Sequence, residues 1–490
     1  MSTSSLAFGM LVAPLICGAA CMLLQRPEVI VRVLAIFTTA FLGAAILLAM
    51  QVFDYPEVLL SSDHSLRVDG FAVFHILVLA FTYFGSSLFG VAYFHHEIAA
   101  GRFAAAMARR YALLWLGGLS AMFLVLVANN LGLMWVGMES TTIVTAFLIT
   151  VRRGSAPIEA MWKYLIICSV GIAFAFMGTL LCAAAVPGTG AGETLLWTHV
   201  MESRANLNPQ LMKVAFVFLI VGYGTKAGLA PMHTWMPDVY SQAPAPVSAM
   251  SSGFMLNASL YCVLRYLPVV EATSPGFGSH LMIGFGLTSV LVAATFISFQ
   301  RDAMRMLAYC SVEHLGIICI GYGLGPLGAF AALLHTLHHT LAKSLAFISV
   351  GRLGQVYGTH DMGRIRGAID AHPVYGSALL ASVLALIGVA PFAIFISEFQ
   401  TVRAMVAQSQ WAVMVFSLIG LSIIFISMLR HVIGMVFGKR PEEVDVVEPH
   451  VGGRLLSFMF LGTLLLLGVW LPPPLLRAIE TAARVVGGQP

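Results

Sequence analysis

The chain has 490 residues, which is long enough for about three soluble domains of roughly 150 residues each. Its composition excludes that arrangement, because hydrophobic residues make up 59% and charged residues only 10%, whereas a soluble globular protein carries about 25% charged residues. The mean hydropathy is +0.90 and the formal net charge is +4. These values predict a membrane protein and exclude a soluble enzyme, a secreted disulfide scaffold, a disordered chain and a nucleic-acid-binding module, which would need a basic run.

Fourteen stretches of the chain are apolar enough to cross a bilayer, since a spanning helix needs about 20 mostly apolar residues. They are 6–24, 29–52, 70–94, 111–128, 130–151, 159–185, 211–229, 246–268, 278–299, 303–322, 326–350, 374–400, 410–437 and 453–475. The longest polar segments are predicted to be connecting loops, and these are 52–69, 186–210, 351–373 and 438–452. The predicted fold is therefore an all-α polytopic membrane protein.

The distribution of basic residues predicts an orientation. When the N-terminus is placed outside the membrane, most loop Lys and Arg residues fall on the cytoplasmic side, among them Arg109, Arg110 and the Arg152-Arg153 pair. The N-terminal sequence lacks the charged start of a cleaved signal peptide, and its apolar run continues to Leu24. We therefore expect a multi-pass protein of the cell (inner) membrane with both termini on the outer, periplasmic side.

Two of the apolar stretches contain the same helix-breaking pattern. Gly228-Leu-Ala-Pro231 closes the seventh stretch and Gly388-Val-Ala-Pro391 interrupts the twelfth. Proline ends a helix, and a break at membrane depth is tolerated only where protein or trapped water satisfies the freed backbone groups. The two breaks are five stretches apart along the chain, and because five is odd, equivalent helices would run in opposite directions, as in transporters built from inverted repeats. The alternative is that such kinks arise by chance in apolar helices.

Ionisable residues lie inside the apolar stretches, where each costs about 2.5–3.5 kcal/mol at the bilayer centre. Glu139 is near the middle of the fifth stretch, and Lys226 lies mid-membrane, five residues before Pro231. A buried lysine keeps its proton beside an ionised carboxylate and tends to lose it when the carboxylate moves away. The two residues are therefore predicted to form a proton switch. The alternative for Glu139 is a neutral structural carboxyl.

A second set of titratable residues lies in the eleventh stretch. His335, His339 and Lys343 are spaced by four residues, which places them on one stripe of a helix. Neutral imidazoles both donate and accept hydrogen bonds, so with intervening waters the stripe predicts a path for protons. His338 lies off the stripe and is predicted to pack or make a lateral contact. A metal site of His335 and His339 is disfavoured, because the sequence has no HExxH glutamate and no third ligand nearby.

Three further charged positions lie within the apolar stretches. Glu398 follows Pro391 by seven residues and is predicted to be the proton's last stop within the membrane. Lys163 is close to the inner end of the sixth stretch, where it either contributes to the path or extends its ammonium to the membrane surface. Glu313-His314 either mirrors Glu139 in the second repeat or forms a pair at a helix end. Together the charges predict a hydrophilic axis along the membrane midplane.

The cysteines are predicted to be packing residues. No two have CxxC spacing, and none has a histidine at metal-ligand distance on a plausible loop; they are Cys17, Cys21, Cys168, Cys182, Cys262, Cys310 and Cys319. We therefore expect no zinc, no iron–sulfur cluster and no other cofactor in this chain.

The segment GTKAGLAPMHTWMPDVYSQAPAPVSAM (224–250) resembles the signature of the antiporter-like subunits shared by respiratory complex I, energy-converting hydrogenases and Mrp-type cation/proton antiporters. The resemblance extends over essentially the whole chain and implies about fourteen helices, with two inverted five-helix repeats and broken helices seven and twelve. The implied division is 1–110 for helices 1–3, 111–268 for helices 4–8, 278–437 for helices 9–13, and 438–490 for a C-terminal loop and helix 14. No long lateral helix is expected after helix 14.

The resemblance also assigns roles. Glu139 corresponds to the family glutamate of helix five, Lys226 to its partner lysine of helix seven, and Glu398 to the terminal residue of helix twelve. The residues implied to translocate protons are Glu139, Lys226, His335, His339, Lys343 and Glu398, with Lys163, Asn257, Glu313 and His338 as further candidates.

Helix eight departs from the commonest family pattern. Asn257 stands where many members have a lysine, and Ser252 stands where others have a histidine. Together with LAYCSVEHLGII, this looks most like the F-type membrane subunit of hydrogenase 4 and formate hydrogenlyase complexes. The missing lysine implies that a water, Lys343 or a helix-eleven histidine bridges Lys226 to the second half.

The resulting hypothesis is a proton-translocating membrane subunit of a multi-subunit, redox-driven complex, not catalytic alone, with the redox cofactors in partner subunits. Protons would be taken up from the cytoplasmic side near the break after Lys226 and released outward after Glu398. The alternatives are the proton-conducting partner of an inorganic-carbon uptake system and an Mrp-like sodium/proton antiporter subunit. A quinone-binding catalytic subunit is disfavoured, because the charges form a chain rather than one pocket.

Overall fold

The computed structural model describes residues 3–54, 59–61, 64–152, 154–187, 195–447 and 451–488. Within these residues the protein is almost entirely helical, with one short antiparallel hairpin of β1 (Leu59–Leu60) and β2 (Arg67–Val68). Eleven of the described helices are long and apolar enough to cross a membrane, and the shorter helices Ser5–Cys21 and Pro373–Leu386 are also apolar. The chain is a multi-pass membrane protein.

The helices follow one another with short connections. In chain order they are α1 (Thr3–Cys21), α2 (Pro27–Asp54), α3 (Gly70–Ala99), α4 (Ala105–Val127), α5 (Leu131–Ile149), α6 (Ser155–Ala184), α7 (Trp197–Glu202), η2 (Arg204–Asn206), α8 (Pro209–Ala227), η3 (Met232–Trp235), α9 (Met236–Gln242), α10 (Ala245–Met250), η4 (Ser251–Met255), α11 (Leu256–Thr273), α12 (Phe277–Ile297), α13 (Ala303–Gly323), α14 (Gly325–Tyr357), α15 (Ala368–Ala371), α16 (Pro373–Leu386), α17 (Ala393–Ala407), α18 (Trp411–Val436), α19 (Val451–Val469) and α20 (Pro473–Val486).

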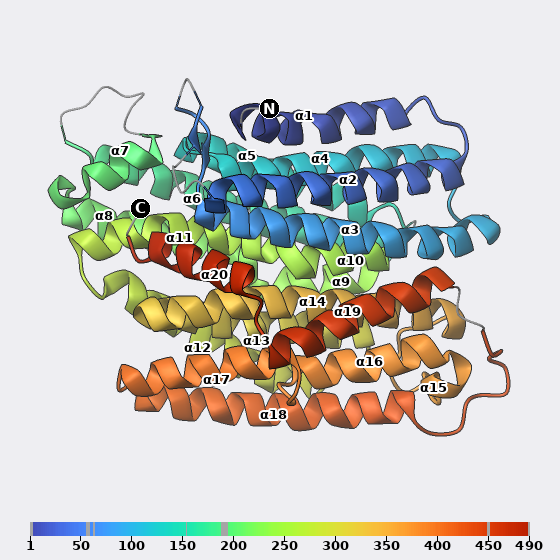
Figure 1. Cartoon of the computed structure of the whole chain (residues 1–490). Helices are drawn as coiled ribbons and strands as arrows, with labels where there is room; N and C mark the ends of the chain where they lie inside the picture. Colours follow the sequence, from blue (N-terminus) through green and yellow to red (C-terminus); the bar gives the residue numbers. More distant parts are fainter. Residues whose placement is uncertain are drawn as a thin grey trace.

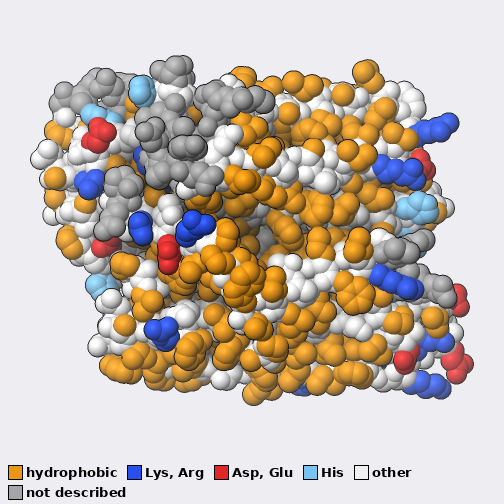
Figure 2. Space-filling view, in the orientation of Figure 1, with side chains coloured by type: hydrophobic (Ala, Val, Ile, Leu, Met, Phe, Trp, Pro, Cys, Tyr) orange, Lys and Arg blue, Asp and Glu red, His pale blue; other side chains and the backbone are white. Residues whose placement is uncertain are grey.

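Most of the long helices run side by side along one direction, and both ends of the described chain lie toward the same end of the bundle (Figure 1). Figure 2 shows apolar side chains across the middle of this face, with charged side chains gathered near the two ends of the helices. This banding is what a lipid bilayer requires, because charged groups reach water only beyond the hydrocarbon core.

Each of the fourteen apolar stretches lies on a helix or on consecutive helices. Both predicted breaks are confirmed. Helix α8 ends at Ala227 and α16 ends at Leu386, and the glycines that follow, Gly228 and Gly388, have positive φ angles of 82° and 69°. Glycine adopts this left-handed conformation without a steric penalty, so it stops each helix cleanly. The count of fourteen crossings and the inverted repeats remain predictions.

Several segments predicted as loops are partly regular. Helix α14 continues to Tyr357, so the predicted loop 351–373 begins with two helical turns, and the loop 52–69 contains the β-hairpin. A further helix that was not predicted, α20, follows α19. Helix α20 has 14 residues with one buried face, so a search for 20 apolar residues misses it. Arg153 and most of the predicted turn 187–193 lie outside the described residues.

The helices differ in how much of their surface other helices cover. Every residue from Ala245 to Val270, which covers α10, η4 and most of α11, is buried within the protein, and so is every residue of α13 except Arg305. Helix α14 packs against α3, α10, α13, α16 and α17. In contrast, most residues of α18 and α6 are not buried. Helices α11, α13 and α14 are therefore shielded from lipid, and polar side chains on them have protein neighbours.

A buried ion pair fastens the hairpin to the bundle. Asp69 accepts hydrogen bonds from Arg265 at 2.7 and 2.9 Å, from Arg67 Nε at 3.0 Å and from the Ala72 backbone at 2.8 Å, which caps α3. Burial alone would raise the pKa of Asp69, but the two guanidiniums hold that pKa well below its usual range. The ionised carboxylate thus joins β2, α3 and α11.

Candidate functional site

Lys226 is completely buried in the last turn of α8, just before the break. Its ammonium donates to Thr142 Oγ1 at 2.8 Å and to Tyr164 OH at 2.5 Å, and it lies 4.8 Å from the centre of the Tyr164 ring. These partners come from α5 and α6. A buried ammonium is therefore held by two neutral oxygens and an aromatic face, an arrangement that leaves its charge without a paired anion.

Glu139 lies on α5, one turn before Thr142, and is partly exposed. One carboxylate oxygen accepts from Ser169 of α6 at 3.1 Å, and the other is buried without a hydrogen-bond partner among the described residues. The described contacts include no ion pair between Glu139 and Lys226. The two side chains are linked through neighbouring positions of α5 and α6 rather than by direct contact.

The three histidines of α14, His335, His338 and His339, are completely buried, and two of them contact side chains of α13 or α17. His335 Nε2 lies 2.9 Å from His314 Nδ1, and His335 Nδ1 lies 2.9 Å from Ser397 Oγ. His338 Nδ1 is 3.4 Å from the same hydroxyl, so its predicted lateral contact is present. His339 has no hydrogen-bond partner among the described residues, and its ring centre is 5.1 Å from that of His314.

Glu313 and His314 lie in the middle of α13, so the alternative of a pair at a helix end is wrong. His314 connects α13 to α14 through His335, whose two ring nitrogens contact His314 and Ser397.

Lys343, which is also on α14, takes part in a set of contacts that connects the second half of the chain with the first half. Its ammonium donates to the Leu307 carbonyl at 2.7 Å, and Ser311 donates to the same carbonyl at 3.1 Å. Ser311 is in turn 2.8 Å from Ser252, which lies in the π-helical turn η4. Ser252, at the position where the resemblance implies a histidine in other members, therefore provides a hydroxyl that contacts α13 in the second half of the chain.

Met255 completes this connection at the other end of η4. Its sulfur accepts from Tyr164 OH at 3.7 Å, and Tyr164 is the residue that holds Lys226. The turn η4 thus lies between the surroundings of Lys226 and those of Lys343.

Glu398 lies on α17 and is partly exposed. One carboxylate oxygen is buried without a hydrogen-bond partner among the described residues, and the other lies where a side chain on Gly388 would stand. It borders a cavity of about 580 Å³ between α17 and α18, whose other walls are mostly apolar, including Phe395, Phe399 and Phe425. Helix α5, which carries Glu139, and helix α17, which carries Glu398, lie toward opposite edges of the view in Figure 1.

Two predicted residues, Lys163 and Asn257, lie outside the row of buried polar groups, which is defined as Glu139, Lys226, Lys343, the α14 histidines and Glu398. Lys163 is about half exposed and pairs with Glu159 at 2.7 Å and with Asp238 at 3.1 Å, and Asp238 also pairs with Arg305. Asn257 is buried, but its amide donates to the Gly253 carbonyl of its own helix at 2.9 Å. In this structure neither residue contacts another member of the row.

A polar cavity of about 790 Å³ opens next to the segment that follows the break. It is lined by Ser241, Gln242 and Pro244 beside α9, by Gly351 and Gly354 of α14, and by charged residues that include Glu97, Arg102, Arg152 and Asp302. The cavity therefore brings polar groups to the end of α14, two turns beyond Lys343.

The sequence interpretation missed Thr142, Tyr164, Ser311 and Ser397, and it treated Cys310 only as a packing residue. Hydroxyl groups are common in membrane helices, so the residue type gives little signal. Only the position of Ser397 beside Glu398, and of Thr142 one turn after Glu139, pointed to them.

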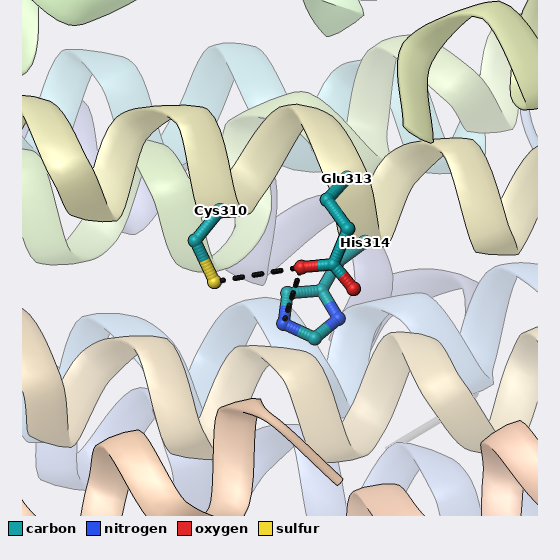
Figure 3. A group of neighbouring side chains, drawn as sticks. All are labelled: Cys310, Glu313 and His314. Atoms are coloured by element: carbon teal, nitrogen blue, oxygen red, sulfur yellow. Dashed lines mark hydrogen bonds and ion pairs between the residues drawn. The ribbon is translucent and has the colours of Figure 1, made fainter. Parts of the chain in front are cut away.

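Cys310 lies one turn before Glu313 and His314 on α13, and the three side chains point toward one another (Figure 3). Cys310 Sγ donates to Glu313 Oε2 at 3.7 Å, and His314 Nε2 is 3.6 Å from the same oxygen. The expectation that no cysteine lies near a histidine at metal-ligand distance considered loops only, and a helix provides the proximity.

Comparison with known proteins gives the family. The sequence profile described as "NADH:quinone oxidoreductase/Mrp antiporter, TM" matches residues 128–424. The chain belongs to this family of antiporter-like membrane subunits. It is 38% identical over 346 residues to "Hydrogenase-4 component F homolog" of Methylacidiphilum infernorum, covering 70% of this chain and 73% of that protein.

More distant relatives are also similar. "Hydrogenase-4 component B" of Escherichia coli is 27% identical over 373 residues, which cover 73% of this chain but 53% of that protein. Among solved structures, a chain of an archaeal membrane-bound sulfane sulfur reductase has a TM-score of 0.88 at 23% identity, covering 98% of this chain and 97% of that chain. A chain of the Mrp complex from a Dietzia species has a TM-score of 0.87 at 19% identity, covering 99% and 98%. These two likenesses establish the shared fold.

Proposed function

We propose that the protein is a proton-translocating membrane subunit of a multi-subunit complex, and that protons move along a lateral row of buried groups. The row begins at Glu139 and Lys226, passes through Lys343 and the α14 histidines, and ends at Glu398. The family supports the transport of ions, and the similarity to hydrogenase-4 component F supports a redox-driven complex.

The observation that carries the proposal is the burial of Lys226. Among the described residues, this ammonium is held by Thr142, Tyr164 and an aromatic face, and no anion lies within hydrogen-bond distance of it. Its protonation state therefore responds to whether Glu139 is ionised and near, which is the property that a switch requires.

In the second half, direct hydrogen bonds supply the route. A proton on His314 can pass to His335 across 2.9 Å and on to Ser397 across another 2.9 Å, and Ser397 adjoins Glu398. Because a neutral imidazole has one donor and one acceptor nitrogen, transfer through His335 requires both of these contacts. His314, rather than His339, is therefore the step that precedes His335.

The gap left by Asn257 is bridged by the hydroxyls of Ser252 and Ser311, each of which can donate and accept at once. Ser311 and Lys343 meet at the Leu307 carbonyl, and because a carbonyl carries no proton, transfer between them would use a water that contacts both. Protons would reach the row from the polar cavity beside α9 and α14.

The role of Lys226 is tested by Lys226→Ala in vesicles that contain the whole complex. We expect coupled proton movement to be lost while the complex still assembles. Lys163→Ala is the matched control, because it removes another lysine of the membrane region that lies outside the row, and it should leave proton movement unchanged. Unimpaired pumping by Lys226→Ala would contradict the proposal.

A second candidate is a cation/proton antiporter component in a complex without a redox module. The 30% identity over 406 residues to a probable K(+)/H(+) antiporter protein of Rhizobium meliloti favours it, although the chain covers only 38% of that protein. Transport that depends on Na⁺ or K⁺, and co-purification with antiporter-like proteins alone, would support this candidate. Co-purification with a redox module would support the first.

Finer parts of the proposal follow from the same arrangement. We expect the two inverted repeats at 111–268 and 278–437, outward-facing termini, and no cofactor bound by this chain. Redox chemistry then belongs to partner subunits, with Glu139 and Glu398 at the lateral ends, where neighbouring membrane subunits would contact them. Mass spectrometry of the purified complex identifies those partners.

A further inference from the structure

Cys310, Glu313 and His314 form a compact buried group of metal-ligating side chains. All three are at most 1% exposed, and one ligand atom from each lies within 4.8 Å of the others. In the part of the chain that the structure describes, no other group of three His, Cys, Asp or Glu residues is so close. Figure 3 shows the thiol, the carboxylate and the imidazole directed toward a common space beside α13.

The distances suit a tetrahedral ion. Bond lengths of roughly 2.3 Å to sulfur and 2.0 Å to oxygen or nitrogen separate two ligands of one zinc ion by ~3.5 Å for sulfur and oxygen and ~3.3 Å for nitrogen and oxygen. The observed separations are 3.7 Å for Cys310 Sγ and Glu313 Oε2, and 3.6 Å for His314 Nε2 and the same oxygen. The third separation, between Cys310 Sγ and a His314 nitrogen, is within 4.8 Å, so side-chain rotation about the shared Glu313 oxygen would bring the three atoms to bonding positions.

His339, a neighbouring histidine outside this group of three, is the side chain that we assign as a fourth ligand after rotation of its ring. His339 is completely buried, and neither of its ring nitrogens has a hydrogen-bond partner among the described residues. Its ring centre is 5.1 Å from that of His314, across the contact between α13 and α14. Such a group loses hydration on burial and gains a partner when it binds a metal.

The charges also balance. A divalent cation in a low-dielectric interior needs two anions, and the Cys310 thiolate and the Glu313 carboxylate provide two. Sulfur with imidazole and one carboxylate favours Zn²⁺ over Mg²⁺ or Ca²⁺, which prefer oxygen ligands. Binding replaces the thiol proton of Cys310, which is released to the buffer.

We propose that Cys310, Glu313, His314 and His339 form a binding site for Zn²⁺ or a similar soft divalent cation, and that metal bound there inhibits the protein. The inhibitory part rests on the proposed function: a metal on His314 Nε2 occupies the nitrogen through which His314 must take up a proton before Nδ1 passes one to His335.

The binding part is tested with Co²⁺ as the probe, because a cysteine thiolate bound to Co²⁺ gives a sulfur-to-metal charge-transfer absorption band. We expect the full chain, purified in detergent, to develop this band at one Co²⁺ per chain and to lose it when Zn²⁺ is added. Cys310→Ser should abolish the band and His314→Gln should weaken binding at least tenfold. Cys319→Ser is the matched control, since Cys319 is another fully buried cysteine of α13, and it should leave the band unchanged.

Absence of the band from a folded wild-type chain, or a band that survives Cys310→Ser, would overturn the site. The melting temperature of each variant shows whether it has folded, and His314→Gln keeps the test decisive if Cys310→Ser does not fold.

Inhibition is measured separately, in vesicles that contain the complex. We expect Zn²⁺ to slow proton movement, and Cys310→Ser to raise the required Zn²⁺ concentration at least tenfold. If Co²⁺ binds to the wild type but Zn²⁺ leaves proton movement intact, the metal site stands and its inhibitory role is wrong. If Lys226→Ala still pumps, the proposed function fails, whatever the metal result.

Discussion

Ser397 is the single hydroxyl that joins the buried histidines of α14 to α17. It lies 2.9 Å from His335 Nδ1 and 3.4 Å from His338 Nδ1, and it is completely buried. Ser397→Ala removes this shared partner and leaves both nitrogens without it. A buried polar group that loses its hydrogen-bond partner costs about 1–3 kcal/mol. If this cost is added once to the free-energy barrier of proton transfer, the rate drops roughly 5- to 150-fold.

The assay is the initial rate of proton movement into vesicles that contain the complex, compared at equal amounts of assembled protein. Ser349→Ala is the matched control, because Ser349 is also fully buried but donates only to the Leu345 carbonyl of its own helix, at 2.7 Å. We expect the control to retain the wild-type rate. A wild-type rate in Ser397→Ala would refute the route through Ser397, and an equal loss in both variants would show that the effect is structural.

Three other variants test separate parts of the account. Tyr164→Phe removes one of the two hydrogen bonds to the Lys226 ammonium and should slow proton movement roughly 10-fold or more in the vesicle assay, since a hydrogen bond to a charged group contributes about 1.5–3 kcal/mol. Ser252→Ala should slow it about tenfold by breaking the contact with the second half, whereas Asn257→Ala should not, because that amide binds its own helix. Asp69→Asn should destabilise the fold by about 3–5 kcal/mol, measured as a lower melting temperature in detergent, because Arg265 loses its buried anion.

The destabilisation caused by Asp69→Asn depends on pH in a defined direction. Because the pKa of Asp69 is lowered in the folded protein, the carboxylate contributes stability above its ordinary pKa of about 4 and loses that contribution as the pH falls toward the lower, folded value. The difference in melting temperature between wild type and Asp69→Asn should therefore be constant from about pH 6 to about pH 8, because the carboxylate is fully ionised roughly two units or more above its ordinary pKa. The difference should shrink below about pH 4. A difference that grows on acidification would contradict the assignment.

For the other two variants the contradicting results are also specific. Wild-type transport in Tyr164→Phe would mean that Thr142 alone suffices to hold Lys226. Equal rates in Ser252→Ala and Asn257→Ala would remove the hydroxyl bridge from the account.

Hydropathy alone located the membrane helices, because burial of apolar side chains in lipid leaves long uninterrupted runs. The proline and glycine pattern correctly placed the ends of α8 and α16. The amphipathic α20 and the π-helical turn η4 were missed. Helix α20 is too short and too polar on one face for a hydropathy search, and a π-turn leaves no distinctive residue pattern.

The part of the site that could be predicted from the sequence is the set of titratable residues that interrupt apolar runs. His335, His339, Lys343 and Lys226 are buried as expected, because each costs too much to face lipid. Their partners were not predictable, since the contacts of His335 with His314 and Ser397 join helices that are 21 and 62 residues away. Such contacts depend on how α13, α14 and α17 pack, and no local spacing encodes that packing.

The central claim is that Lys226 in the first half and His335 in the second half act in series on one route. The direct measurement is proton movement by Lys226→Ala, His335→Ala and the double variant in vesicles with equal amounts of assembled complex. The account predicts that each single variant alone abolishes proton movement and that the double variant is no worse. If each single variant retains a substantial share and only the double variant is inactive, the two halves conduct independently and the single row is wrong.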